Sequence, residues 1–298
     1  MTVQDGIRSF GPEDLSLIPP RKADANKGTY GHVLVIAGSE GMCGAAYLSA
    51  LAAYRTGAGL VRIFTPEPNR QILQIQLPEA IVTSYDTDTV NADREVWKTR
   101  IAELMEWASA VVLGPGLGKA DYVKDLVEDV LEAAYVPLII DADALNAIAE
   151  YPYLTGFYTE NMILTPHVGE MARLTGRTIA ELLNDPAAAA AEYRDTYGVN
   201  CVLKCHQTVT AATDGQLYRT LSGTPALAKA GTGDVLTGII AGCLCLGMEE
   251  GQAAAFGSFL HGMAGLKAAE RSSVHGVLAR EVAESVPFVM RAVPGVTF

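Results

Sequence analysis

The stretch ALAKAGTGDVLTGIIAG, residues 226–242, joins a run of small residues to a long apolar segment through one acid, Asp234. The apolar residues at positions 235, 236, 239 and 240 recur at helical intervals, which predicts a glycine-rich loop that runs straight into a helix. The first turn of a helix has unpaired backbone N–H groups and a partial positive charge. Glycines before it let a bound group approach the backbone closely. Such a junction can hold an anion, typically a phosphate.

Asp234 stands at the mouth of this predicted anion site. A carboxylate there is unfavourable unless it has a task. The task that suits it is the removal of a proton from a hydroxyl group that is about to be phosphorylated. Asp234 could equally be only the N-cap of the helix. The motif by itself does not decide between a catalytic base and a cap.

Length, composition and charge limit the class of protein. The chain has 298 residues, of which 49% are hydrophobic and 19% charged, so one large α/β domain or two small ones can bury a sizeable core. A formal net charge of -12 argues against a nucleic-acid partner and against an anionic membrane surface. Small anionic ligands stay compatible with it, because helix ends and a metal ion can hold phosphates locally.

The chain start and the cysteines indicate a cytoplasmic protein. The first residues, MTVQDGIRSFGPEDL, are polar and lack the apolar segment of a secretory signal. No window of about 20 residues is apolar enough to predict a membrane span. The five cysteines are an odd number, and the pairs Cys201/Cys205 and Cys243/Cys245 do not have zinc-site spacing. They are interpreted as small buried residues in a reducing compartment.

Apolar runs alternate with helical patterns along most of the chain. Strands are predicted at 32–38, 60–65, 79–85, 110–118, 136–145 and 162–167, and helices after several of them, at 252–269 and at 277–286. Residues 201–220 differ, because they read as a strand followed by a hairpin that turns at Asp214-Gly215. This alternation predicts an α/β fold with a mostly parallel central sheet and helices on both faces. We expect a single domain over 1–298, with residues 1–30 an irregular arm broken by prolines.

Distinctive polar residues and glycines follow several predicted strands. They are Gly38-Ser39, Gly114-Pro115-Gly116, Asp141-Ala142-Asp143, Thr165-Pro166-His167 and Lys204. Ligands of open α/β sheets bind beyond the carboxyl ends of the strands, so these residues are expected to converge on one site. Each has a plainer alternative: the glycines make turns, Asp141 caps a helix, His167 bonds a loop carbonyl, and Lys204 is solvated.

The motifs together resemble a known family. KGTYGHVLVIAGS, GAAYLSALAAYRTGAGLV, LGPGLG, IIDADALN, ILTPHVGE, VLKCHQTV and ALAKAGTGDVLTGIIAG resemble, in this order, the ADP/ATP-dependent NAD(P)H-hydrate dehydratases of the ribokinase-like fold, over about residues 27–285. The resemblance implies a hydro-lyase that repairs the S form of hydrated NADH and NADPH. In this family the added hydroxyl is phosphorylated, with ADP giving AMP in bacterial members, and phosphate then leaves.

The resemblance also implies a role for particular residues. Asp234 matches the catalytic aspartate and a contact to the hydrated dinucleotide. The other matched positions are Ala45, Gly116 and His167 for the dinucleotide; Lys204, Cys205, His206, Gln207, Thr208 and Gly233 for the adenine nucleotide; and Gly231, Thr232 and Gly233 for the anion hole. Glu170 corresponds to an acid that orders Mg²⁺ and water indirectly. Two departures, Cys205 and Ala230, stand where the family often has glycine.

Two other functions are compatible with parts of this pattern. An ordinary ribokinase-like kinase of a vitamin precursor, such as hydroxyethylthiazole, would share the fold and GTGD. A non-catalytic protein that binds adenine nucleotides would not need Asp234. The family resemblance further implies Mg²⁺, ADP or ATP as co-substrate, no nucleic-acid or membrane partner, and a homo-oligomer such as a homotetramer.

Overall fold

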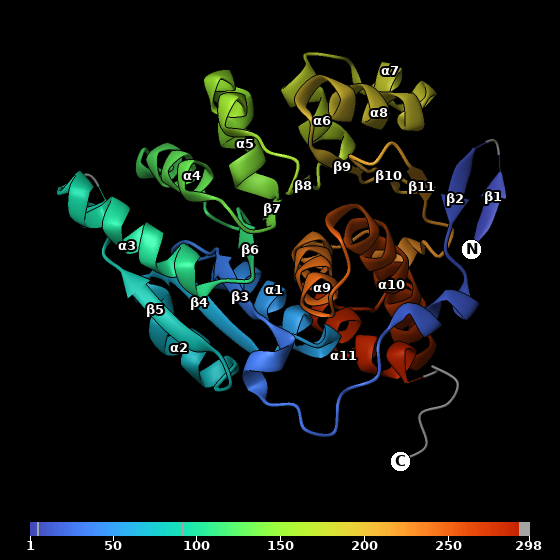
Figure 1. Ribbon diagram of the computed structural model, residues 1–298, viewed down its shortest axis with the longest axis horizontal. Coiled ribbons are helices and arrows are strands. Elements are labelled where there is room, and N and C mark those ends of the chain that lie inside the picture. Colours follow the sequence, from blue (N-terminus) through green and yellow to red (C-terminus); the bar gives the residue numbers. More distant parts are fainter. Residues whose placement is uncertain (5, 91, 292–298) are drawn as a thin grey trace.

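The computed structural model describes residues 1–4, 6–90 and 92–291. Within them an 11-stranded sheet runs through the molecule, in the order β1-β2-β11-β10-β9-β8-β7-β6-β3-β4-β5 (Figure 1). The strands are β1 Thr2–Gln4, β2 Ile7–Ser9, β3 His32–Ile36, β4 Leu60–Pro66, β5 Ile81–Tyr85, β6 Ala110–Leu113, β7 Leu138–Ile140, β8 Met162–Leu164, β9 Asn200–Leu203, β10 Val209–Ala211 and β11 Leu217–Arg219.

Every neighbouring pair of strands from β5 to β9 is parallel. The predicted hairpin follows β9, since β10 pairs antiparallel with both β9 and β11. Its turn lies at Asp214-Gly215, where Gly215 has a φ of +87° and the N–H of Gln216 donates to Asp214 Oδ1. A positive φ is a conformation that glycine adopts without strain. The mostly parallel sheet and the hairpin of β10 and β11 are therefore confirmed.

Side chains alternate between the two faces of the sheet, and helices cover both faces (Figure 1). In β3, Val33 and Val35 belong to one hydrophobic core and Leu34 and Ile36 to the other, as the two-residue period of a strand requires. The first core packs under α1 Cys43–Thr56, α2 Arg70–Gln76, α9 Thr232–Cys245, α10 Glu250–Arg271 and α11 Ala279–Met290. The second packs under α3 Arg94–Trp107, α4 Tyr122–Ala133, α5 Ala142–Glu150, α6 Val168–Thr175, α7 Ile179–Asn184 and α8 Pro186–Tyr197.

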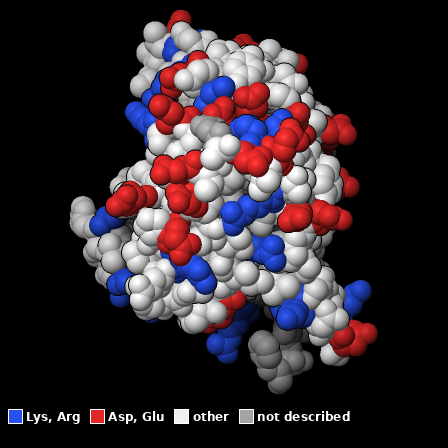
Figure 2. Space-filling model, turned by 90° about the vertical axis from the view of Figure 1, so that its left-hand side faces the viewer, with Lys and Arg blue, Asp and Glu red and all other residues white. Residues whose placement is uncertain are grey.

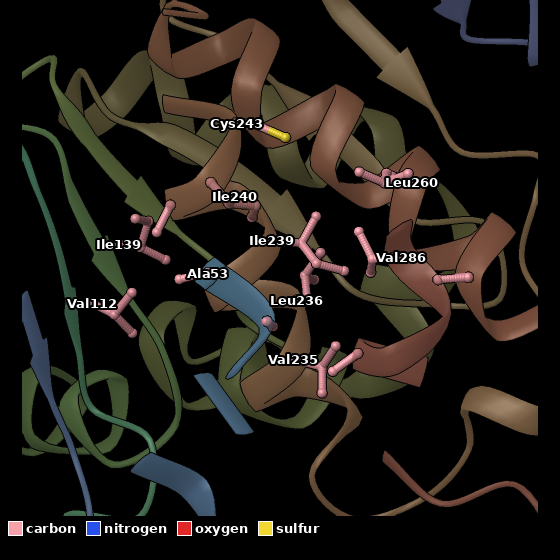
Figure 3. Close-up of a cluster of buried hydrophobic side chains, with 14 of the residues drawn as sticks. Ala53, Val112, Ile139, Val235, Leu236, Ile239, Ile240, Cys243, Leu260 and Val286 are labelled. Carbon is pink, nitrogen blue, oxygen red and sulfur yellow. The ribbon is translucent and has the colours of Figure 1, made fainter. Parts of the chain in front are cut away.

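Helix α9, which begins inside the GTGD motif, is buried on several sides. Figure 3 shows its apolar side chains between sheet residues such as Ile139 and residues of the outer helices such as Leu260. Gly238 lets α9 lie directly against α1, because a β-carbon added there would collide with the carbonyl oxygen of Ser49. Ser49 also donates from its hydroxyl to the carbonyl oxygen of Asp234 at 3.0 Å. Packing on α1, α10 and the sheet thus fixes where α9 begins.

Residues 1–4 and 6–30 contain more regular structure than we predicted. Strands β1 and β2 pair antiparallel, and β2 adds to the sheet next to β11 by pairing Arg8 with Tyr218. Phe10 is buried and stacks on Tyr218 with a ring-centroid distance of 5.5 Å. The prediction of an irregular arm was wrong at β1 and β2. Each strand has three residues, which is too short to show the alternating hydrophobic pattern that would have predicted it. The single domain over 1–298 stays a prediction, and residues 292–298 of it lie outside the described part.

The helices depart from the predicted ranges mainly at their ends. Helix α11 spans Ala279–Met290 where 277–286 was predicted, and α3 was not predicted at all. Within the ranges 1–4, 6–90 and 92–291, none of the helices combines the length and the apolar character that crossing a membrane requires. Acidic and basic side chains are intermixed on the face seen in Figure 2.

Candidate functional site

The polar residues that follow the strands converge at one edge of the sheet, as we predicted. Their backbones are joined by hydrogen bonds: Gly38 N–H donates to the carbonyl oxygen of Pro115, and Lys204 N–H to that of Pro166, each at 2.8 Å. His167 and Lys204 also form a parallel β-bridge just beyond β8 and β9. The carboxyl ends of these parallel strands therefore bring together residues that lie far apart in the sequence.

Asp141 and Lys204 form a short ion pair at the centre of this edge. Lys204 Nζ donates to Asp141 Oδ1 at 2.6 Å, and the side chain of Asp141 is 2% exposed. Asp141 stands at the N-cap position of α5 but makes no side-chain capping bond, so the plainer alternative of a helix cap is wrong. Gly114 lets the backbone of Asp141 lie close to it, because a β-carbon at Gly114 would collide with the carbonyl oxygen of Asp141. The next residue, Ala142, has a φ of +50°, a strained conformation of the kind found at functional sites.

A second carboxylate shares the lysine. Glu170 is buried, and its Oε2 lies 3.8 Å from Lys204 Nζ. Burial by itself would lower the pKa of Lys204, but Asp141 and then Glu170 outweigh it and raise that pKa. Burial raises the pKa of Glu170, and the charge of Lys204 opposes that increase. The ammonium group therefore stays charged among the carboxylates.

His167 caps helix α6. Its Nδ1 accepts hydrogen bonds from the backbone N–H groups of Gly169 and Glu170, at 2.9 and 3.1 Å. In return Glu170 Oε2 accepts the backbone N–H of His167 at 2.7 Å, which completes a capping box. The imidazole thus bonds amide groups and not a loop carbonyl. Because Nδ1 accepts, the proton of the neutral ring is on Nε2. Burial, followed by the charge of Lys204, lowers the pKa of His167.

Asp234 lies in the first turn of α9, but it does not cap the helix. The N-cap position is Gly231, which has a φ of +89°, and no side-chain capping bond is made at this helix end. Burial raises the pKa of Asp234 to about 6, and the charge of Asp141 adds to this. The charge of Lys204 acts in the opposite direction and lowers the pKa of Asp234. A carboxylate with a pKa near 6 is ionised at neutral pH and is still a useful proton acceptor.

The glycine loop lies directly against the ion pair. A β-carbon added at Gly233 would be 3.5 Å from Lys204 Nζ and 3.6 Å from Asp141 Oδ2. On the other side, a β-carbon at Gly231 would be 2.6 Å from Leu48 Cδ1 of α1. One turn earlier in α1 is Ala45, whose β-carbon would be 2.8 Å from a β-carbon at Gly116. The structure therefore places the pair Ala45 and Gly116 on the α1 side of the loop, and Lys204 on the opposite side.

A pocket of about 620 Å³ opens beside Lys204 and the loop. Its lining comprises His167, Lys204, Cys205, His206, Thr208, Thr220, Gly223, Thr224, Pro225, Leu227, Ala228, Thr232, Gly233, Leu236, Ser258, His261 and Gly262. Most of the residues expected to bind the nucleotide are among them, whereas Gln207 is exposed and does not line the pocket. His167, expected on the dinucleotide side, lies on the wall of this same pocket.

Two features of the site escaped the sequence reasoning. The ion pair of Asp141 with Lys204 had only a weak signal, an acid that follows a strand. The wall formed by Ser258, His261 and Gly262 had none, because these residues lie in the middle of a long helical pattern. Only the packing of α10 against α9 brings that wall to the loop.

The donors at the site fit Mg²⁺ only as an ion held largely by other ligands. Among the described residues, no group of three or more His, Cys, Asp or Glu side chains is arranged to hold a metal ion. Lys204 Nζ already contacts both Asp141 and Glu170. Mg²⁺ characteristically keeps several waters and binds one or two carboxylates together with the phosphates of a substrate. An indirect role of Glu170 toward Mg²⁺ stays a prediction.

The family resemblance is confirmed by comparison with known proteins. The family model described as NAD(P)H-hydrate dehydratase matches residues 33–287. The chain is 38% identical over 275 residues to the ADP-dependent (S)-NAD(P)H-hydrate dehydratase of Bacillus subtilis, covering 92% of this chain and 94% of that protein. It spans about half the length of the first curated relatives that it matches, which are bifunctional NAD(P)H-hydrate repair enzymes.

Solved structures agree on the fold. The Bacillus subtilis ADP/ATP-dependent NAD(P)H-hydrate dehydratase, co-crystallised with ATP and Mg²⁺, has a TM-score of 0.81 at 33% identity and covers 97% of this chain and 99% of its own. A ribokinase-like superfamily protein from Enterococcus faecalis has a TM-score of 0.84 at 27% identity and covers 98% of each chain. The predicted ribokinase-like fold is thereby confirmed.

Proposed function

The chain belongs to the NAD(P)H-hydrate dehydratase family, and we propose that it removes water from the S form of hydrated NADH and NADPH in an ADP-dependent reaction. The observation that carries this proposal is the position of Asp234. It is a largely buried carboxylate with a pKa of about 6, at a glycine-rich helix N-terminus and beside an ammonium group. That arrangement suits the transfer of a phosphoryl group to a hydroxyl.

Asp234 is assigned the role of base for the first step. It takes the proton of the ring hydroxyl, whose oxygen forms a bond to the terminal phosphorus of ADP. The bond from that phosphorus to the bridging oxygen breaks, and AMP leaves with the electron pair. The lone pair of the ring nitrogen then expels phosphate, and loss of a ring proton restores the double bond. NADH or NADPH, AMP and phosphate are the products.

The anion hole and Lys204 are assigned to the phosphates. The backbone N–H groups at Gly231, Thr232 and Gly233 belong to a helix N-terminus, which favours negative charge. Lys204 is next to Gly233 and carries a charge stabilised by Asp141. Bound Mg²⁺ would neutralise part of the charge on the transferred group, with Glu170 ordering its water. These contacts stabilise charge that grows in the transition state.

The two ligands are assigned to the two sides of the loop. The adenine nucleotide occupies the 620 Å³ pocket with Lys204, Cys205, His206 and Thr208. The hydrated dinucleotide approaches from the side of Ala45 and Gly116 and reaches Asp234. His167 lines the nucleotide pocket, and its assignment to the hydrated dinucleotide rests on the family resemblance. A homo-oligomer and a cytoplasmic location stay part of the proposal on the strength of the family resemblance and the sequence.

One experiment separates this function from its rivals. The protein is incubated with chemically hydrated NADH, Mg²⁺ and ADP, while dihydronicotinamide absorbance and free phosphate are followed together. A dehydratase raises both signals in equal amounts. A vitamin-precursor kinase would give neither, and a kinase acting on the hydrate would accumulate a phosphorylated product without NADH. A protein that only binds nucleotide would leave the mixture unchanged, which would refute the proposal.

A further inference from the structure

Helix α10 contributes to the nucleotide pocket a polar side chain to which no role has yet been assigned, His261. It lines the pocket together with Ser258 and Gly262, which lie on the same face of the helix. The hydroxyl of Ser258 is already used, since it donates to the carbonyl oxygen of Ala254 at 2.8 Å. Gly262 offers no side chain and is pressed against Ser222. His261 is therefore the polar group of this wall that is left to interact.

The imidazole of His261 is 9% exposed, and its Nε2 is enclosed without a hydrogen-bond partner among the described residues. His261 lines the same pocket wall region as Thr232, which lies in the first turn of α9, and α10 packs directly on α9. Leaving a polar group buried and unpaired costs about 1–3 kcal/mol. A leucine or phenylalanine would fill the same volume without that cost. The unpaired Nε2 therefore indicates that His261 gains a hydrogen-bond partner when the loop holds a ligand.

The ring is neutral under ordinary conditions. Burial lowers the pKa of His261 to about 4, and the charge of Lys204 acts in the same direction. A neutral imidazole has one donor and one acceptor, so it can support a backbone group without placing a second full charge beside Lys204. Such a support does not compete with Lys204 for the phosphates.

We propose that His261 is a positioning residue for the nucleotide, which acts through Thr232 to hold the loop of Gly231–Gly233 in the geometry that receives the phosphates of a nucleoside diphosphate. The inference rests on the proposed function, because it takes the pocket beside Lys204 as the nucleotide site. It adds that helix α10, which packs on α9, sets the geometry of the loop. His261 lines the pocket beside Lys204, whereas Ala45 and Gly116 are not among the residues that line it. The two ligands are therefore expected to respond differently to the loss of His261.

The test is calorimetric titration of the whole protein with ADP and Mg²⁺ and, separately, with hydrated NADPH in the absence of ADP. His261→Leu removes both ring nitrogens, and His261→Asn keeps a donor and an acceptor. Ser285→Ala, which removes a buried hydroxyl of α11 that donates to the carbonyl oxygen of Glu281, is the control outside the pocket. We expect His261→Leu to weaken ADP binding about tenfold or more, while the Kd for hydrated NADPH stays within about twofold. His261→Asn should be intermediate, and Ser285→Ala should bind both ligands as the wild type does.

A structural role alone predicts a different result, in which both ligands weaken together and the melting temperature falls. That result would overturn the inference, as would a His261→Leu protein that binds ADP normally. If His261→Leu does not fold, the His261→Asn titrations decide, and an unchanged Kd for ADP refutes the role. A wild-type protein without affinity for ADP would overturn the nucleotide assignment itself and this inference with it. Wild-type binding with an unaffected variant overturns only the role of His261.

Discussion

Replacing Asp234 by Asn should make the enzyme slower and the fold more stable at the same time. The side chain keeps its shape but can no longer accept the hydroxyl proton. Loss of a general base reduces a rate by about 10²–10⁴-fold. Asp234 makes no capping bond that the substitution could break. We therefore expect kcat at saturating ADP to fall by that factor in a well-folded protein.

The gain in stability follows from the pKa. A shift of the Asp234 pKa from 3.8 to about 6 corresponds to about 3 kcal/mol between the neutral and charged forms of the folded protein. The side chain is partly open to the cleft, so solvent screens part of this, and we expect about 1–2 kcal/mol to be recovered at pH 8. For a chain of this size that raises the melting temperature by about 2–6 °C.

The pH dependence of melting tests whether Asp234→Asn is the more stable of the two proteins. Well below pH 3.8 the carboxyl is protonated in the folded and unfolded states alike, so Asp234→Asn and the wild type should melt together. Between about pH 4 and pH 6 the unfolded-state carboxyl ionises first, so the wild type loses stability as the pH rises through the folded-state pKa and the melting temperatures of the two proteins should separate. Wild-type kcat/KM should rise through the same pH range. Retention of most of kcat, or a variant less stable than the wild type at pH 8, would refute the assignment of Asp234 as a buried base.

Three further predictions concern the surroundings of that base. Lys204→Met leaves Asp141 without its cation, so ADP binding should be lost and the melting temperature should fall. Because Lys204 lowers the pKa of Asp234, any residual rate of the variant should rise only at higher pH. Titration with ADP, thermal melting and a pH–rate profile measure these three effects. Gly238→Ala should lower the melting temperature by several degrees because the added methyl meets the carbonyl oxygen of Ser49, whereas Gly44→Ala, with nothing within 4 Å of the new carbon, should not. ADP should give a higher kcat/KM than ATP, and equal or greater values with ATP would reverse that assignment.

Much of the fold could be predicted because its signals are local. The strand residues around Val33 and Val35 are apolar on both faces, as a buried parallel strand must be. The apolar run of α9 marked a buried helix, and Asp214-Gly215 marked a hairpin turn. Helix α3 was missed because its buried residues, such as Trp97 and Ile101, are diluted by charged ones. The strands β1 and β2 were missed because three residues carry no period.

The candidate site was predictable in its parts but not in its pairings. Residues at the ends of parallel strands must meet at one edge, so the neighbourhood of Lys204 and His167 followed from topology. The topology did not predict which side chains Lys204 and His167 contact. Asp141 had a plausible role as a cap, and only the structure shows that its side chain contacts Lys204 instead. His261 depends on how α10 crosses α9, which no local pattern encodes.

The division of the site between buried and exposed elements explains why the sequence can depart from the family pattern without losing the base. Asp234 lies in the first turn of a helix that α1, α10 and the sheet hold from several sides, so its position depends on residues far from the ligands. The nucleotide segment after Lys204 is more open, and His206 and Gln207 are exposed. There Cys205 donates from its thiol to the carbonyl oxygen of Gln207 at 3.1 Å and closes a turn that a glycine would leave without a side-chain bond. A change at Cys205 should therefore alter nucleotide affinity and leave the pH dependence set by Asp234 in place.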